Sequence, residues 1–395
     1  MYFELSQKNN NNFTLNFSIK NYILSTDLGW QSIDGLYGKI IYKGYAYQNL
    51  ANFLKNHDPD KLDSIKGSFT AVMEKNNNIY LVTDNNREFP VYVDRDRNLI
   101  TNLVQQKEIF WADNLVYIDS IKNKIHCRHN EVKFAFGPPQ SLEETTEKIL
   151  TILNKSIKDF TALYNYPIKI VPTAGLDSTL VIALLKHNNV NFEVIDYEYK
   201  KWTYFYLKNK SRLRDLLAAQ PVSIFSKIGH SWGEVPKTLA NGWQGEQYFG
   251  REYLTLAILC KIKKIDLKKE ISNFRNAYAY DFMIEEISKR ESQWQEITND
   301  VNNKESAYKK IIEIAIASFE TWSVEETCYW SPLKDIKILQ NILHMNDVDI
   351  ITNALCGTIQ KKIIEKIDPD LLDFITLTKN NYDSLNQTSY QKYIG

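Results

Sequence analysis

The sequence lacks paired cysteines and long apolar runs, and its first residues do not predict a targeting segment. Its four cysteines follow no regular spacing: Cys127, Cys260, Cys328 and Cys356. With no Cys-x-x-Cys pair among them, they indicate free thiols in a reducing compartment. Polar residues 7–12 stand where a signal peptide would need an apolar core, and no apolar stretch is long enough to cross a bilayer. We therefore expect a cytoplasmic protein without a membrane partner.

Net charge is also missing. The 395 residues include 48 Lys plus Arg and 48 Asp plus Glu, so the formal net charge is zero. Without an overall positive field we expect no nucleic-acid partner. The length suggests two or three domains.

The first part of the chain contains short runs rich in Tyr, Val, Ile and Phe, separated by Asn or Gly. Four such runs are residues 13–17, 39–42, 69–73 and 79–83. Each has the length of a strand, and residues 74–78 between the last two read as a hairpin loop. We predict an antiparallel β domain over residues 1–137, with one helix near residues 46–55.

A second domain is predicted over residues 138–395, after the Gly-Pro-Pro segment 137–139. Ser141 and Glu144 have the spacing of a capping box, which predicts a helix to about Leu163. A strand at Ile168, a helix to about Lys186 and a strand over residues 192–195 then form a βαβ unit. The pattern predicts an α/β fold with a parallel sheet. Residues 254–322 are charged and periodic, which predicts added helices.

The stretch from Val171 to Ile182 carries the strongest chemical signal. Small residues end a buried strand and precede a helix, so backbone N–H groups and the helix N-terminus could bind an anion. Asp177 is a candidate Mg²⁺ ligand, and the hydroxyls of Thr173 and Ser178 could donate to phosphate oxygens. A strand-turn-helix without a ligand is the plainer alternative.

The loop resembles the Ser-Gly-Gly-x-Asp-Ser loop of ATP pyrophosphatases that adenylate a carboxylate. Four further segments, in the same order as in asparagine synthetases, are similar to motifs of that superfamily. They are residues 65–92, residues 241–250 (Asn-Gly-Trp-Gln-Gly-Glu-Gln-Tyr-Phe-Gly), residues 331–335 (Ser-Pro-Leu-Lys-Asp) and residues 360–379. The resemblance covers nearly the whole chain. It implies an α-β-β-α domain of the Ntn-hydrolase type, followed by an ATP pyrophosphatase domain with a doubly wound parallel sheet and helical additions.

The resemblance also implies an activity. In this superfamily, which includes β-lactam synthetases and lasso-peptide cyclases, ATP adenylates a carboxylate and an amine then displaces AMP. Glutamine-dependent members carry a cysteine at the second position, whereas this chain has Tyr2. We therefore expect an ATP- and Mg²⁺-dependent ligase that takes a small-molecule or peptide carboxylate and an amine or ammonia, without its own glutaminase. A homodimer is possible in this family.

The superfamily motifs transfer roles to several residues. Asp177 and Glu246 correspond to the metal-binding acids, and Lys379 to a lysine that neutralises charge at the acyl centre. Glu325 or Glu326 is the candidate base for the amine. The residues expected to bind ATP or pyrophosphate are Thr173, Ala174, Gly175, Leu176, Asp177, Ser178, Gly242, Lys361 and Lys362.

Three positions depart from the superfamily pattern and keep alternatives open. Ala174 replaces a glycine, Gln247 replaces a glutamate, and Cys328 stands where the family has its base. A ring-closing or peptide-cyclising ligase is one alternative. A catalytically silent nucleotide-binding scaffold is a second. A sulfur-transferring tRNA enzyme with the same loop is a third, and the neutral charge and the unpatterned cysteines count against it.

Overall fold

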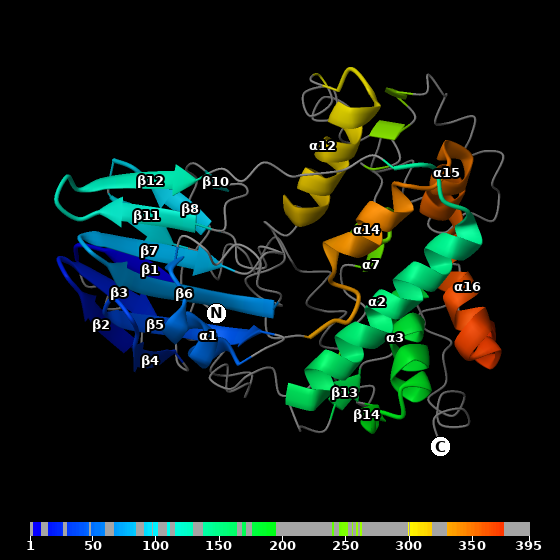
Figure 1. Cartoon of the computed structure of the whole chain (residues 1–395), viewed down its shortest axis with the longest axis horizontal. Helices are drawn as coiled ribbons and strands as arrows, with labels where there is room; N and C mark the ends of the chain where they lie inside the picture. Colours follow the sequence, from blue (N-terminus) through cyan, green and yellow to red (C-terminus); the bar gives the residue numbers. More distant parts are fainter. Residues whose placement is uncertain are drawn as a thin grey trace, which may run out of the picture.

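Sheets gather in the first part of the chain and helices in the second (Figure 1). The computed structural model describes residues 3–8, 15–26, 30–46, 49–59, 67–83, 91–96, 98–101, 109–110, 115–128, 137–163, 168–170, 176–194, 239–240, 245–251, 255, 258–259, 261–262, 299, 301–317 and 330–374. Most strand pairing in these residues is antiparallel. The predicted mixture of helices and sheets is confirmed at this coarse level.

Two six-stranded antiparallel sheets make up the first part. In spatial order, the first sheet consists of β10 (Ile109–Phe110), β8 (Val91–Asp94), β9 (Leu99–Thr101), β1 (Phe3–Ser6), β3 (Tyr22–Thr26) and β2 (Leu15–Ile19). The second consists of β12 (Lys124–Arg128), β11 (Leu115–Asp119), β7 (Asn78–Thr83), β6 (Gly67–Lys75), β5 (Lys39–Ala46) and β4 (Gln31–Asp34). The predicted hairpin is confirmed, because β6 pairs with β7 from Lys75 opposite Asn78 onward.

Alternation along the strands builds a core on each face of the second sheet. Val72 of β6 belongs to the cluster that joins the two sheets, together with Phe3 of β1 and Leu81 of β7. Its neighbours Ala71 and Met73 point to the opposite face, as successive strand residues do. Most of the first part is therefore a β-sandwich.

The helix predicted near residues 46–55 begins later than expected. Helix α1 spans Leu50–Asn56, and it packs Leu50 and Leu54 on the outer face of the second sheet. The prediction was wrong at its start because Ala46 still pairs with Gly67 in the sheet. The side chain of Asn49 accepts a hydrogen bond from the Asn52 amide and so begins the helix. Of the residues described before 137, only those of α1 form an α-helix.

Hydrogen bonds fix the segment that connects the first part to the second. The Gln140 amide donates to the His344 carbonyl at 2.9 Å, which ties the linker to a distant turn. Helix α2 (Leu142–Leu163) follows, and the Glu144 amide donates to Oγ of Ser141 at 3.1 Å. The predicted N-terminus and end of this helix are confirmed.

A small parallel sheet follows α2. Strand β13 (Ile168–Ile170) lies between β14 (Phe192–Val194) and β15 (Leu239–Ala240) and runs parallel to both. Helix α3 (Leu176–His187) connects β13 to β14, so the predicted βαβ unit is confirmed. Three short strands are all the parallel sheet that the described residues contain, so the larger doubly wound sheet stays a prediction.

Helices surround this unit. They are α7 (Gly245–Tyr248), α12 (Lys304–Ala317), α14 (Ile336–Ile342), α15 (Asp347–Cys356), α16 (Thr358–Ile367) and the 3₁₀ helix η3 (Pro369–Phe374). Within the 254–322 stretch, α12 fulfils the expectation of helices, and most of the remainder lies outside the described residues. None of the helices that can be described combines the length and apolarity needed to span a membrane.

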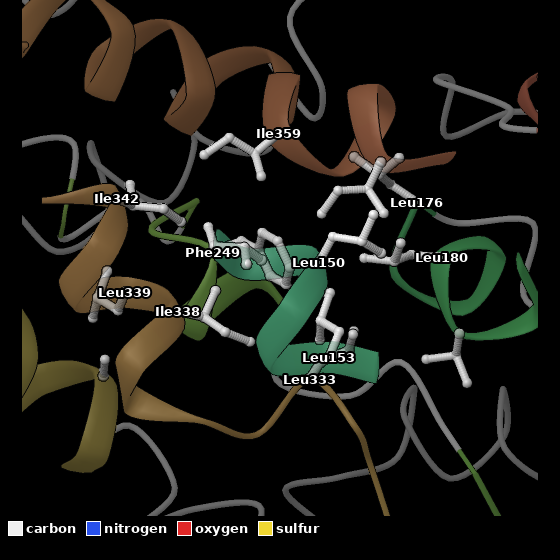
Figure 2. Close-up of a cluster of buried hydrophobic side chains, with 14 of the residues drawn as sticks. Leu150, Leu153, Leu176, Leu180, Phe249, Leu333, Ile338, Leu339, Ile342 and Ile359 are labelled. Atoms are coloured by element: carbon white, nitrogen blue, oxygen red, sulfur yellow. The ribbon is translucent and has the colours of Figure 1, made fainter. Parts of the chain in front are cut away.

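Helix α3 lies inside this shell. Every residue from Leu180 to Leu185 is buried, so the helix has no solvent-facing side over that stretch. Helices α2 and α16 and the 3₁₀ helix η3 pack against it. Figure 2 shows the shared core, in which Leu176 and Leu180 of α3 face Leu150 and Leu153 of α2 and Ile359 of α16. This packing fixes the first turn of α3, where the candidate site lies.

Candidate functional site

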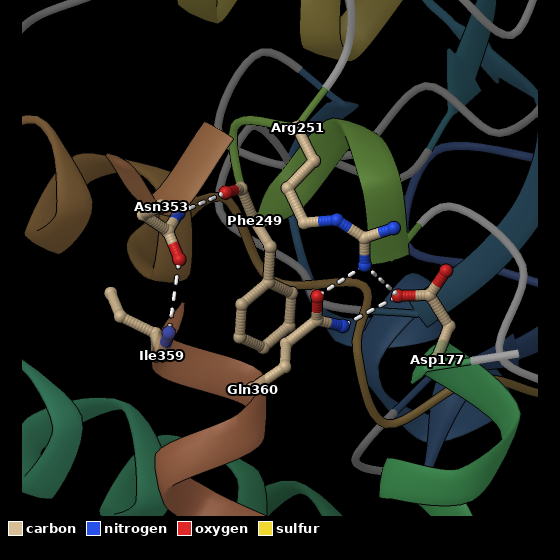
Figure 3. Close-up of polar contacts among 6 residues, drawn as sticks. All are labelled: Asp177, Phe249, Arg251, Asn353, Ile359 and Gln360. Carbon is tan, nitrogen blue, oxygen red and sulfur yellow. Dashed lines mark hydrogen bonds and ion pairs between the residues drawn. The ribbon is translucent and has the colours of Figure 1, made fainter. Parts of the chain in front are cut away.

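Asp177 lies in the first turn of α3, at the end of the predicted anion-binding loop. Its side chain is 16 % exposed, whereas its neighbours Leu176 and Ser178 are buried. Oδ1 of Asp177 accepts hydrogen bonds from Nη1 of Arg251, at 3.0 Å, and from Nε2 of Gln360 (Figure 3). The acid is thus partly accessible and held from one side.

Arg251 and Gln360 also bond to each other. Nη1 of Arg251 donates to Oε1 of Gln360, so the three side chains form a closed ring of hydrogen bonds. The Arg251 side chain is 1 % exposed and Gln360 is fully buried. A buried guanidinium requires a negative partner, and Asp177 supplies one.

Gly245, the first residue of α7, lies against the same carboxylate. A Cβ atom on Gly245 would be 2.2 Å from Oδ1 of Asp177 and 2.9 Å from its Cβ. No side chain other than hydrogen fits there. Glu246 follows directly in α7, but its side chain lies outside the described residues, so its predicted role as a second metal ligand is not tested.

The junction of α15 and α16 lies against the first turn of α3. Gly357 has a left-handed backbone with φ of 62°, and a Cβ there would lie 2.3 Å from Cδ2 of Leu176. Asn353 is fully buried, donates from Nδ2 to the Phe249 carbonyl at 2.7 Å and accepts from the Ile359 amide at 3.0 Å. Figure 3 shows Asn353 between these two groups. One amide side chain therefore joins the segment after α7 to the start of α16.

A metal ion bound at Asp177 would take most of its ligands from substrate and water. Oδ2 of Asp177 accepts no hydrogen bond from any residue that the structure describes. Within that same part of the chain, no group of three or more His, Cys, Asp or Glu could hold a metal ion. One free carboxylate oxygen suits Mg²⁺, which is commonly held by one or two carboxylates together with substrate phosphates and water.

The two candidate lysines of α16 lie beside Gln360 in sequence. The ammonium of Lys362 is 3.7 Å from Oε2 of Glu143, on α2. Lys361 influences the thiol of Cys356, whose pKa is raised by burial and lowered to a smaller extent by the lysine's charge. Neither lysine forms an ion pair with Asp177, so their predicted contact with pyrophosphate stays a prediction.

Segment 331–335 packs in the core. Ser331, Leu333 and Asp335 are buried, and Trp330 just before them stacks on Phe160 of α2 with ring centroids 3.9 Å apart. The side chain of Asp335 accepts from the Lys337 amide and begins α14. These contacts give the segment a structural role.

Several predicted site residues lie outside the described part of the chain. They are Thr173, Ala174, Gly175, Gly242, Glu325, Glu326 and Lys379. Their expected roles are untested.

Sequence reasoning missed Arg251 and Gln360 as partners of Asp177. The sequence offered an indication for both, because they adjoin or belong to segments that resemble superfamily motifs. Arg251 directly follows segment 241–250, and Gln360 is the first residue of segment 360–379. Gln360 was passed over because the two lysines after it are the usual partners of phosphate. The hydrogen bonds of Gln360 join residues far apart in the chain, so only the folded structure reveals them.

Comparison with known proteins adds no family assignment. No protein-family model matches the chain, and no curated protein matches it.

Proposed function

We propose that this chain is an ATP-dependent, AMP-forming ligase that adenylates a carboxylate and couples it to an amine or free ammonia. In fold terms, the proposal is a degenerate α-β-β-α domain of the Ntn-hydrolase type followed by an ATP pyrophosphatase domain of the asparagine synthetase superfamily. ATP and Mg²⁺ are the proposed cofactors, and a small molecule or peptide provides the carboxylate.

One observation supports this proposal above the others. Three sequence segments that resemble superfamily motifs meet at one carboxylate, although they are far apart in the chain. Asp177 of the loop segment contacts Gln360, which is 183 residues away, and lies against Gly245 of the segment between them. If the resemblance to the superfamily were due to chance, there would be no reason for these three segments to meet at one place in the fold.

The residues have distinct tasks under this proposal. Asp177 would hold Mg²⁺ through Oδ2, and the first turn of α3 would direct its N–H groups and positive dipole end toward the phosphates. Bound Mg²⁺ would neutralise negative charge on the transferring phosphates. Gly245 would keep the backbone of α7 close to Asp177 and so bring Glu246 to the same region.

A catalytically silent nucleotide-binding scaffold is a second candidate, which a specific observation favours. The guanidinium of Arg251 lies 3.0 Å from the carboxylate of Asp177, so part of the acid's charge is already neutralised within the protein. An acid paired in this way could be structural. A ring-closing or peptide-cyclising ligase shares the same adenylation step and gives the same result in a test of that step.

Pyrophosphate release from ATP separates ligase from scaffold. Purified protein with Mg²⁺ and ATP would be screened against a panel of carboxylic acids and peptides. We expect at least one acid to promote pyrophosphate release and ATP–pyrophosphate exchange. ATP binding without turnover on any acid in a broad panel would favour the scaffold.

A variant control ties any activity to this site. Asp177→Asn should lower the exchange rate by about 10²–10³-fold, because it removes a metal contact to developing phosphate charge. It also removes the counterion of buried Arg251, so its folding must be verified by circular dichroism and urea unfolding. A folded Asp177→Asn protein with wild-type exchange would contradict the assignment.

A further inference from the structure

We propose that Arg251 and Gln360 are positioning residues, which hold Asp177 so that one carboxylate oxygen, Oδ2, faces the metal. This inference rests on the proposed function, and it assigns a task to two residues that the motif comparison left without one. The opposite oxygen, Oδ1, accepts the hydrogen bonds of both residues.

The geometry of the ring restricts rotation of the carboxylate. Arg251 and Gln360 both end in planar groups whose hydrogen bonds have fixed directions. Each bonds to Asp177 and to the other, so a rotation of the Asp177 carboxylate would break two bonds at Oδ1. Because both partners are buried, neither has room to follow such a rotation.

Packing around the ring adds to this restriction. The backbone of Gly245 lies on one side of the carboxylate. Asn353 locks the chain just before Arg251 to the start of α16, which carries Gln360, through its bonds to Phe249 and Ile359. Arg251 and Gln360 therefore stand on segments whose separation is fixed by a third side chain.

A fixed single oxygen has a chemical consequence. Mg²⁺ requires nearly ideal octahedral geometry, and a carboxylate free to rotate would offer it two oxygens in varying directions. Hydrogen-bonded partners of metal ligands typically contribute about 10–100-fold to metal affinity. We therefore expect the ring to affect metal affinity far more than nucleotide affinity.

Metal binding and nucleotide binding can be measured separately. Mn²⁺ serves as the probe in place of Mg²⁺, and electron paramagnetic resonance reports the free ion in the presence of saturating ATP. Binding of a fluorescent ATP analogue in excess EDTA reports nucleotide affinity without metal. Neither measurement depends on turnover or on knowing the carboxylate substrate.

The variants are Arg251→Met and Gln360→Met, with Lys366→Met on the same helix as a matched control. We expect both ring variants to lose about tenfold or more in Mn²⁺ affinity of the ATP complex. Metal-free nucleotide binding should stay within about threefold of wild type. Lys366→Met should leave Mn²⁺ affinity near the wild-type value, because its ammonium pairs with Glu147 of α2.

Three outcomes would overturn part of this scheme in distinguishable ways. Wild-type protein that binds neither ATP nor its Mn²⁺ complex would overturn the proposed function itself. Ring variants with wild-type Mn²⁺ affinity would overturn the positioning role alone. Equal losses of metal-dependent and metal-free binding would also overturn it, because they indicate a purely structural ring. Gln360→Met keeps the Asp177–Arg251 pair, so it decides the question if Arg251→Met does not fold.

Discussion

Gly245 and Asp177 approach each other so closely that a Cβ on the glycine would lie 2.2 Å from Oδ1 of the aspartate. Arg251 and Gln360 both donate hydrogen bonds to that oxygen, so the carboxylate could not move away from a new Cβ without breaking them. Gly245→Ala should therefore destabilise the protein by about 1–3 kcal/mol, the usual range for overpacking. Urea unfolding followed by circular dichroism measures this change.

A matched glycine makes the test of Gly245 specific. A Cβ on Gly137 would meet its nearest neighbour, His344, at 3.5 Å, which is ordinary contact. Gly137→Ala should leave the free energy of unfolding within about 0.5 kcal/mol of wild type. Equal stability of the two variants would mean that the close approach at Asp177 does not exist in solution.

The second prediction concerns Gly357, between α15 and α16. Its left-handed φ costs about 1–2 kcal/mol for an alanine, and contact with Leu176 adds about 1–3 kcal/mol. Asparagine tolerates the left-handed region, so Gly357→Asn would be mild if the backbone were the only constraint. We expect Gly357→Asn to destabilise nearly as much as Gly357→Ala, because both carry a Cβ 2.3 Å from Cδ2 of Leu176.

A double variant tests the cause of the Gly357 effect. Leu176→Ala removes the atom that the new Cβ would meet. The cost of Gly357→Ala should therefore be smaller in the Leu176→Ala background, with a coupling energy of about 0.5 kcal/mol or more. Additive costs would assign the effect to the backbone alone.

The third prediction concerns pH and Cys356. Burial raises the pKa of this thiol, and the charge of Lys361 offsets part of that effect. A pKa raised on folding means that the thiol's contribution to stability is complete below the unfolded pKa, about 8.5. It is lost as pH rises through the folded value. Cys356→Ala should therefore show a weaker loss of stability between neutral and alkaline pH.

Alkylation provides a second measurement on the same thiol. Because the thiolate is the reactive form, Cys356 should react slowly with iodoacetamide at neutral pH in the native protein. Lys361→Met should slow it further by removing the charge that favours the thiolate. Peptide mapping by mass spectrometry resolves Cys356 from the other cysteines. Faster labelling in Lys361→Met would refute this account.

The fourth prediction separates adenylation from amide formation and depends on the proposed function. Lys379→Ala should lose amide product by about 10²-fold or more, because charge at the acyl centre develops during amine attack. It should retain most substrate-dependent ATP–pyrophosphate exchange. Lys379→Arg should not restore full activity, since a planar guanidinium differs in shape from a compact ammonium. Amide formation at the wild-type rate in Lys379→Ala would show that this alignment was wrong.

Local patterns in the sequence predicted much of the fold. The capping box at Ser141, the hairpin between β6 and β7 and the βαβ unit around α3 are all present. Each follows from interactions between residues that are close in sequence. Ser141 caps a helix, a polar turn joins β6 to β7, and the spacing of apolar residues changes from strand to helix at α3. The start of α1 was missed because Ala46 favours helices, whereas pairing with Gly67 decided its state.

Long-range contacts were harder to predict. Asp177 was predicted as a site residue because an acid after a small-residue loop has a known chemical use. Gln360 was not predicted, because a neutral amide indicates no particular chemistry in a sequence. Its partner Asp177 also lies 183 residues away. The left-handed turn at Gly357 was missed too, since nothing near it in the sequence indicates that Leu176 approaches it.

This separation in the chain has a consequence for biosynthesis. The ring around Asp177 cannot close on the ribosome until Gln360 has emerged from the exit tunnel. Until then the guanidinium of Arg251 lacks Gln360, one of its two ring partners, and loop closure over such a length is slow. Nascent chains paused before that residue should therefore expose the interior around α3 to proteases and chaperones, whereas chains extended past it should become resistant.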